Sequence, residues 1–173
     1  MASPRVLVPL PDRDFDTTEV AVPWRLLTRR GFEVVFATAL GATPACDPLL
    51  LTGVLFGQLR AEPEPRAFYR ELVREPRFAS PLAFGEVDPA TFDGLLLPGG
   101  HAQGMRPYLE DPAVHRFAAH FFHARKPVAA ICHGVLVLAR TTDPRTGKSV
   151  LHDRRTTCLP RYMERTAHYL TAW

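Results

Sequence analysis

The first forty residues pass from a short apolar run to a helical spacing and back to a short apolar run. Val6–Leu10 has the consecutive apolar residues of a short buried strand. Helical spacing follows over Glu19–Arg30, and Asp16 stands three residues before Glu19, as in a capping box. Phe32–Ala37 then predicts a second strand. This order indicates a βαβ unit, which requires parallel strands.

Prolines interrupt the pattern in two places. Pro23 lies inside the helical spacing, and it predicts a kink or a later start of that helix. Residues 41–91 hold many prolines and show one clear period, a helix over Pro65–Arg74. We therefore expect an irregular insertion at about 41–91 within a single domain that spans residues 1–173.

Strands and helices alternate again in the second half of the chain. Buried strands are expected at Gly94–Leu97 and Pro127–Ile131, and helices at Asp111–His123 and Gly134–Arg140. A short hairpin or two separate extended pieces follow at Ser149–Leu151 and Arg155–Cys158, and a final helix is expected at Pro160–Trp173. The whole pattern predicts an α/β fold, a three-layer sandwich with a mainly parallel sheet.

Composition and charge narrow the classes of function. The chain has a net charge of +3. Its arginines are spread along the sequence and form no dense basic tract of the kind that binds nucleic acids. The opening apolar run is too short for a secretory signal, and no run is long enough to span a membrane. The three cysteines form no Cys-x-x-Cys pair. We expect a cytoplasmic protein with neither nucleic-acid nor membrane partners.

The segment around Cys132 carries the strongest chemical signal. A strand of small and β-branched residues runs directly into a helix, and Cys132 lies at the junction, as in a nucleophile elbow. Ala130 and Gly134 are the small residues that such a tight turn needs two positions before and after the nucleophile. The helix N-terminus favours a thiolate. A free cysteine is more often a buried apolar residue, but this context favours a nucleophile.

A second loop is expected to lie near this cysteine. The strand Gly94–Leu97 ends in Pro98-Gly99-Gly100, and paired glycines let backbone N–H groups approach a ligand. Pro-Gly-Gly alone is more often only a turn. Its place one βα unit before Cys132 puts both loops at the same edge of a parallel sheet.

Metal and nucleotide sites are not predicted. His115, His120 and His123 do not share one face of a helix, so they cannot converge on one ion. No Gly-x-Gly-x-x-Gly follows the first strand. We expect a protein without a cofactor.

These motifs together resemble the ThiJ/PfpI superfamily, whose fold is related to that of class I glutamine amidotransferases. Three matches carry the resemblance, in chain order: Glu19, Leu97-Pro98-Gly99-Gly100-His101 and Ala130-Ile131-Cys132-His133-Gly134. The Gly-Gly-His loop and the helix in the insertion are most similar to the heat-shock chaperone and glyoxalase III clade. The resemblance implies a flavodoxin-like sandwich.

The resemblance also implies a role for each matched residue. Cys132 would be the nucleophile, and a protonated Glu19 would donate a hydrogen bond to its sulfur. His133 would be the general acid and base, with its ring oriented by Glu164 or, as the alternative, Asp153.

Oxyanion and substrate-binding groups follow from the same match. The backbone N–H groups of Gly100 and His133 would hold an oxyanion. The full set of binding residues implied by the resemblance is Gly99, Gly100, His101 and Gly134.

The implied function is that of a cofactor-independent cysteine enzyme acting on small reactive carbonyls, such as methylglyoxal, or a related deglycase. A PfpI-type peptidase or amidohydrolase is one alternative, and a redox-sensing or chaperone-like stress protein is another. Family chains usually continue with another strand and helix beyond the point where this chain stops at Trp173, so a shortened form is expected. A homodimer would cover the sheet edge left exposed.

Overall fold

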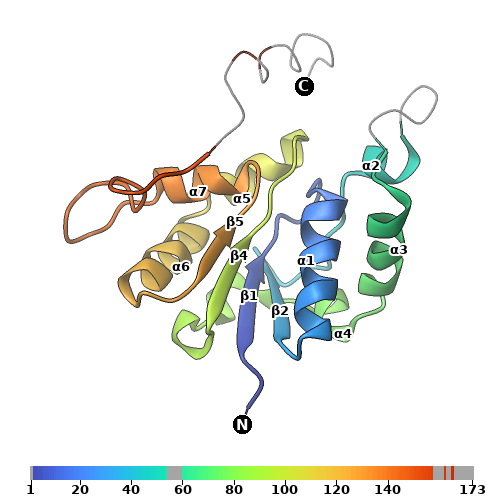
Figure 1. Ribbon diagram of the computed structural model, residues 1–173, viewed down its shortest axis with the longest axis horizontal. Coiled ribbons are helices and arrows are strands. Elements are labelled where there is room, and N and C mark those ends of the chain that lie inside the picture. The colour runs from blue at the N-terminus through green and yellow to red at the C-terminus, as the bar shows by residue number, and fades with distance from the viewer. Residues whose placement is uncertain (1, 54–59, 158–161, 163–164, 166–173) are drawn as a thin grey trace.

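A parallel five-stranded sheet forms the centre of the molecule (Figure 1). The computed structural model describes residues 2–53, 60–157, 162 and 165. The strands lie in the order β3-β2-β1-β4-β5, and every neighbouring pair is parallel. Their bounds are β1 Arg5–Pro9, β2 Glu33–Thr38, β3 Leu82–Ala83, β4 Gly94–Leu97 and β5 Val128–Ala130. The predicted α/β fold with a parallel sheet is therefore confirmed.

Helices cover both faces of this sheet and complete the three layers. Figure 1 shows α1 and α3 on one side, and α5, α6 and α7 on the other. The helices are α1 Thr17–Arg29, α2 Pro48–Thr52, α3 Pro63–Leu72, α4 Pro76–Ala79, α5 Arg106–Glu110, α6 Pro112–His123 and α7 Gly134–Arg140. None of the helices in the described ranges is long and apolar enough to cross a membrane.

Helix α1 begins where the sequence predicts an N-cap. The Asp16 carboxylate accepts hydrogen bonds from the backbone N–H groups of Thr18 at 2.7 Å and Glu19 at 3.1 Å. The expectation that Pro23 would delay the helix is wrong, because α1 continues through it from Thr17 to Arg29. Val20 and Trp24 of this helix are buried, and that packing offsets the one backbone hydrogen bond that a proline removes.

The described parts of the region 41–91, residues 41–53 and 60–91, contain more regular structure than the prolines suggest. This region contains α2, α3, α4 and the short strand β3, which extends the sheet by pairing with the end of β2. Phe78 lies at its centre, in edge-to-face contact with Phe36 at 5.1 Å between ring centroids. Two residues of strand are too few for a periodicity to reveal, which explains why β3 was not predicted.

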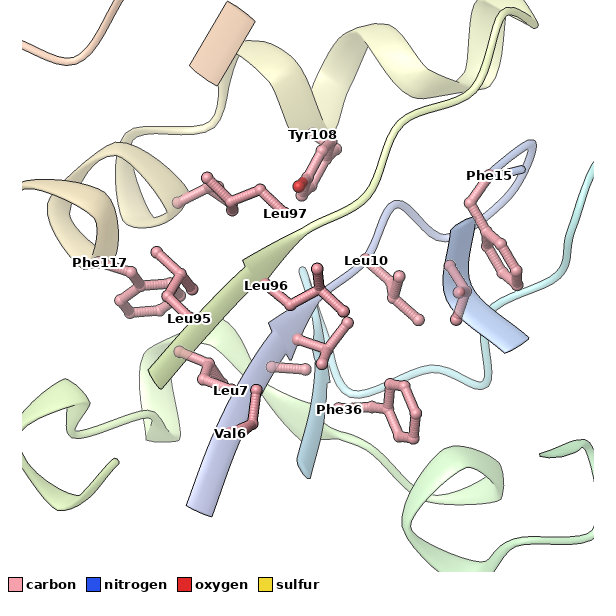
Figure 2. Close-up of a cluster of buried hydrophobic side chains, with 14 of the residues drawn as sticks. Val6, Leu7, Leu10, Phe15, Phe36, Leu95, Leu96, Leu97, Tyr108 and Phe117 are labelled. Atoms are coloured by element: carbon pink, nitrogen blue, oxygen red, sulfur yellow. The ribbon is translucent and has the colours of Figure 1, made fainter. Parts of the chain in front are cut away.

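Successive side chains of β4 point to opposite faces of the sheet, as the pleat of a strand requires. Figure 2 shows Leu95 and Leu97 on the side of the sheet that carries Phe117 and Tyr108, while Leu96 points to the other side. All five side chains are at most 5% exposed. Strand β4 is thus packed between two apolar layers, and this packing fixes the position of the Gly-Gly loop that follows it.

The expected extended pieces after α7 are largely absent. Ser149 makes a single antiparallel bridge with Thr142 instead of pairing with the segment after Arg155. Residues 155–157 are not in a strand. Cys158, Glu164 and nearly all of the predicted helix Pro160–Trp173 lie outside the described residues.

Candidate active site

Two loops that carry chemistry meet at the carboxyl edge of the sheet. Strand β1 pairs with β2 on one side and with β4 on the other, and the chain order reverses at this point. Open α/β sheets bind ligands at such a switch point. The Gly-Gly loop follows β4 and Cys132 follows β5, which is the neighbouring strand.

Cys132 occupies a strained backbone turn. Its φ is 51°, in the left-handed region that a residue with a side chain rarely adopts. Strand β5 ends two residues earlier, and α7 begins at Gly134, two residues later. The backbone N–H of Gly134 donates to the Ile131 carbonyl at 2.8 Å and closes the turn. This is the strand-turn-helix geometry of a nucleophile elbow.

Glycines allow the elbow to pack against the neighbouring loop. A Cβ on Gly134 would collide with the Leu97 carbonyl oxygen at the end of β4. A Cβ on Gly99 would lie 2.7 Å from the His133 backbone nitrogen. Both neighbours are backbone atoms, which cannot rotate away. The two glycines are therefore needed to bring the loops together.

Glu19 connects the two loops. Its Oε2 accepts a hydrogen bond from the Gly99 backbone N–H at 2.7 Å, and the same carboxyl hydrogen-bonds the Cys132 thiol. Burial raises the pKa of Glu19 to about 7, although the Gly99 N–H lowers it in part. The pKa of Glu19 is thus close to neutral pH.

The thiol is harder to ionise than the sequence suggests. Burial around the sulfur and the charge of the Glu19 carboxylate raise the pKa of Cys132 to about 12, whereas the His133 backbone N–H lowers it. The expected stabilisation of a thiolate by the helix N-terminus is therefore outweighed, first by burial of the sulfur and then by the charge of Glu19. Protonation of Glu19 removes that charge and supplies a donor to the sulfur.

Two histidines lie close to the sulfur. Nδ1 of His133 lies 3.5 Å from Sγ of Cys132. The His133 and His101 rings meet edge to face, with centroids 4.8 Å apart and planes at 89°. Cys132 and His101 are exposed, and His133 is half-buried. The sulfur can thus be approached from solvent with two imidazoles beside it.

Of the two predicted orienting acids, only Asp153 lies among the described residues. Asp153 lies 3.7 Å from the His152 Nε2, and its side chain is 93% exposed. Glu164 lies outside the described residues, so its assignment stays a prediction.

One of the predicted binding residues, Gly99, already has a hydrogen-bond partner for its backbone N–H. The Gly99 N–H is engaged by Glu19, so this glycine holds the carboxyl in place. Gly100 lets its loop pass close to the β1–α1 loop, since a Cβ there would lie 2.6 Å from the Asp14 carbonyl oxygen. Its role as an oxyanion donor remains a prediction.

Two polar groups near Glu19 were not found from the sequence. Asp16, identified only as a helix cap, also raises the pKa of Glu19 through its charge. Tyr108 is 2% exposed, and its hydroxyl has no hydrogen-bond partner among the described residues. Burial and the charge of Glu19 raise the pKa of Tyr108. No periodicity in its segment marks this position.

A cavity of about 1330 Å³ opens beside the elbow. Cys132 and His133 line it together with apolar residues of β5 and α7 and the segment after Leu151. This is larger than the roughly 300–1,000 Å³ of most small-molecule pockets. The site therefore has room for more than a three-carbon substrate.

Comparisons with known proteins agree with this geometry. The chain is 27% identical to an uncharacterized protein of Schizosaccharomyces pombe over 97% of its length, and it covers 63% of that protein. It is 44% identical to Deglycase PfpI of Pyrococcus furiosus over 72 residues, which are 40% of this chain and 42% of the relative. The chain thus spans less than two thirds of the length of these relatives.

Solved structures show the same fold. Glyoxalase III from Candida albicans matches with a TM-score of 0.72 and 18% identity, covering 98% of this chain and 74% of that one. The family described as ThiJ/PfpI family-like matches residues 10–173, which include the Glu19 helix, the Gly-Gly loop and the cysteine elbow. This protein belongs to the ThiJ/PfpI-like family.

Proposed function

We propose that this protein is a cofactor-independent cysteine enzyme that acts on small reactive carbonyl compounds. The observation that carries the proposal is the contact of one sulfur with two proton-transfer groups. The Cys132 thiol is hydrogen-bonded to Glu19 and lies 3.5 Å from the His133 Nδ1, on an elbow that solvent can reach. A thiol with two adjacent proton acceptors is suited to adding to an aldehyde.

The raised pKa of Cys132, at about 12, favours attack with simultaneous proton transfer over a preformed thiolate. With methylglyoxal, the S–H proton passes to Glu19 or His133 as the sulfur bonds to the aldehyde carbon, and the aldehyde oxygen takes a proton back from that group, giving a hemithioacetal. His133 then moves a proton from that carbon to the neighbouring carbon, while the hydroxyl proton passes to the neighbouring carbonyl oxygen, which leaves a thioester of lactate. Water cleaves the thioester and restores the thiol.

Lactate production tests this proposal. The purified full chain is incubated with methylglyoxal, and lactate is measured beside a glyoxalase III as positive control. We expect lactate from the wild type and from Cys46→Ser, whose thiol is buried. Cys132→Ser should form none. The absence of lactate from a folded wild-type protein, while the positive control is active, would contradict the proposal.

Deglycase activity is the second candidate. It is favoured by the 44% identity to Deglycase PfpI and by a cavity larger than methylglyoxal requires. The same Cys132 would act on a carbonyl already attached to an amine or thiol. Release of the free amine from a methylglyoxal adduct, in the absence of free methylglyoxal, distinguishes the two activities.

We further propose a homodimer in the cytoplasm that uses neither nucleic acid nor a membrane. Strand β5 lies at the edge of the sheet as far as the described residues show, and its Ala129 is exposed. A second copy would cover this edge. Sedimentation equilibrium of the full chain tests it, with a mass of 19.3 kDa expected for the monomer and twice that for the dimer.

A further inference from the structure

We propose that His101, Cys132 and His133 form a binding site for a thiophilic divalent metal, with Zn²⁺ as the expected ion, and that the bound metal blocks the nucleophile. Each residue offers one ligand atom, and these three atoms all lie within 4.8 Å of one another. The proposal rests on this geometry and does not depend on carbonyl chemistry.

The set of donor atoms indicates which metals it would take. One sulfur and two imidazole nitrogens are borderline-soft ligands, and Zn²⁺ is commonly held by Cys and His with three protein ligands and one open position. Calcium and magnesium need oxygen ligands, and among the described residues this cluster contains no carboxylate. The sequence did not predict such a site, because His101 lies about thirty residues before the elbow.

The spacing of the ligand atoms is close to what zinc requires. In a tetrahedral site with Zn–S of about 2.3 Å and Zn–N of about 2.0–2.1 Å, sulfur and nitrogen lie about 3.5 Å apart. Sγ of Cys132 and Nδ1 of His133 are 3.5 Å apart. The remaining separations, at no more than 4.8 Å, need to shorten by at most about 1.4 Å.

The three ligand residues come from two segments, the elbow and the end of the Gly-Gly loop. Cys132 and His133 are held by the elbow, which has backbone contacts on both sides. His101 is exposed and directly follows the Gly-Gly loop. The two imidazole rings already meet edge to face, with their centroids 4.8 Å apart.

Metal binding has a simple proton balance. The S–H bond breaks, a Zn–S bond forms, and the proton leaves to Glu19 or to water. The electron pair on sulfur that would attack a carbonyl carbon is then donated to the metal. Affinity should consequently fall as the pH is lowered, because protons compete with the ion for sulfur and imidazole.

The experiment combines metal titration with alkylation. The full chain is stripped with a chelator and titrated with Zn²⁺, and the rate of Cys132 alkylation by iodoacetamide is followed by mass spectrometry. We expect saturation at one ion per chain, a rate at least about tenfold lower at saturation, and full recovery with chelator. Co²⁺ should give visible tetrahedral bands and a thiolate-to-cobalt charge-transfer band.

Three variants decide the assignment. His101→Ala should weaken binding by at least the roughly 100-fold that loss of an outer-shell partner can cost, with unchanged thermal unfolding. His123→Ala, an exposed histidine on α6, and Cys46→Ser should bind as the wild type does. Equal affinity in His101→Ala and the wild type, protection that needs more than one ion, or no thiolate–cobalt band would each overturn the proposal.

Discussion

The protonation of the Cys132 thiol and that of the Glu19 carboxyl depend on each other. Glu19 has a pKa raised to about 7 mainly by burial, and Cys132 has one raised to about 12 by burial and by Glu19. Groups this close titrate as a pair, so a change in one alters the other. At the scale of single residues, the charge on Glu19 therefore controls the reactivity of the sulfur.

Replacing Glu19 by glutamine should make the thiol more acidic. Glu19→Gln removes the carboxylate charge that raises the pKa of Cys132 and keeps an N–H donor near the sulfur. We expect alkylation at pH 8 to become roughly three- to tenfold faster for each unit by which the pKa falls. The pH profile of the rate measures this, and Glu19→Ala should give a smaller gain because it lacks the donor. An unchanged profile in Glu19→Gln would contradict the coupling.

The same residue should make folding stability depend on pH. The pKa of Glu19 rises on folding from 4.5 to about 7, so the folded state holds this proton more tightly. Its contribution to stability is complete below about pH 4.5 and is lost as the pH rises through about 7. Urea unfolding from pH 4.5 to 8 should show a smaller loss of stability in Glu19→Gln than in the wild type. Parallel curves for the two proteins would rule this out.

At the scale of elements, the turn between β5 and α7 determines where the sulfur lies. The left-handed backbone at Cys132 is tolerated because both sides of the turn are held by neighbouring backbone. The absence of side chains at Gly99 and Gly134 makes this packing possible. A small change in one of these glycines should consequently displace the nucleophile.

Gly134→Ala tests this packing. The added Cβ would meet the Leu97 carbonyl, a backbone atom, and overpacking of this kind costs about 1–3 kcal/mol. We expect that loss in chemical denaturation, together with altered Cys132 alkylation. Gly85→Ala is the matched control, because a Cβ at Gly85 meets nothing within 4 Å. Equal stability of the two variants would show that the elbow tolerates a side chain.

The sequence predicts the elements better than the energetics of the site. Consecutive apolar residues in β1 and β4, together with the small residues around Cys132, were enough to predict a parallel sheet and an elbow. They do not reveal that the Gly99 N–H is directed at Glu19, or that Tyr108 is buried nearby. Those facts depend on contacts between segments about eighty residues apart, which no local pattern carries.

At the scale of the whole molecule, the region 41–91 belongs to the core. Phe78 is fully buried and contacts Phe36 of β2 and Phe15 of the loop before α1. Phe15 also pairs with Cys46 through a backbone bridge. This region thus supports the loop that leads to Glu19.

Truncation of the central phenylalanine should destabilise the entire domain. Phe78→Ala removes a fully buried aromatic ring, which typically costs about 3–5 kcal/mol. Val73→Ala in the same region is the control, because Val73 is 42% exposed. Urea denaturation followed by circular dichroism measures both. If Phe78→Ala unfolds in two separate transitions, the region is an independent unit.

The hydrogen bond between Gly99 and Glu19 spans eighty residues of sequence, and Cys132 joins them from still further along the chain. Such nonlocal contacts form late in folding, when loop closure has been completed. An unfolded chain leaves Cys132 with an ordinary thiol pKa of about 8.5, whereas the native fold raises it to about 12. The native state therefore shields this thiol from indiscriminate alkylation, and a short pulse of alkylating reagent during refolding would record the moment at which the three segments come together.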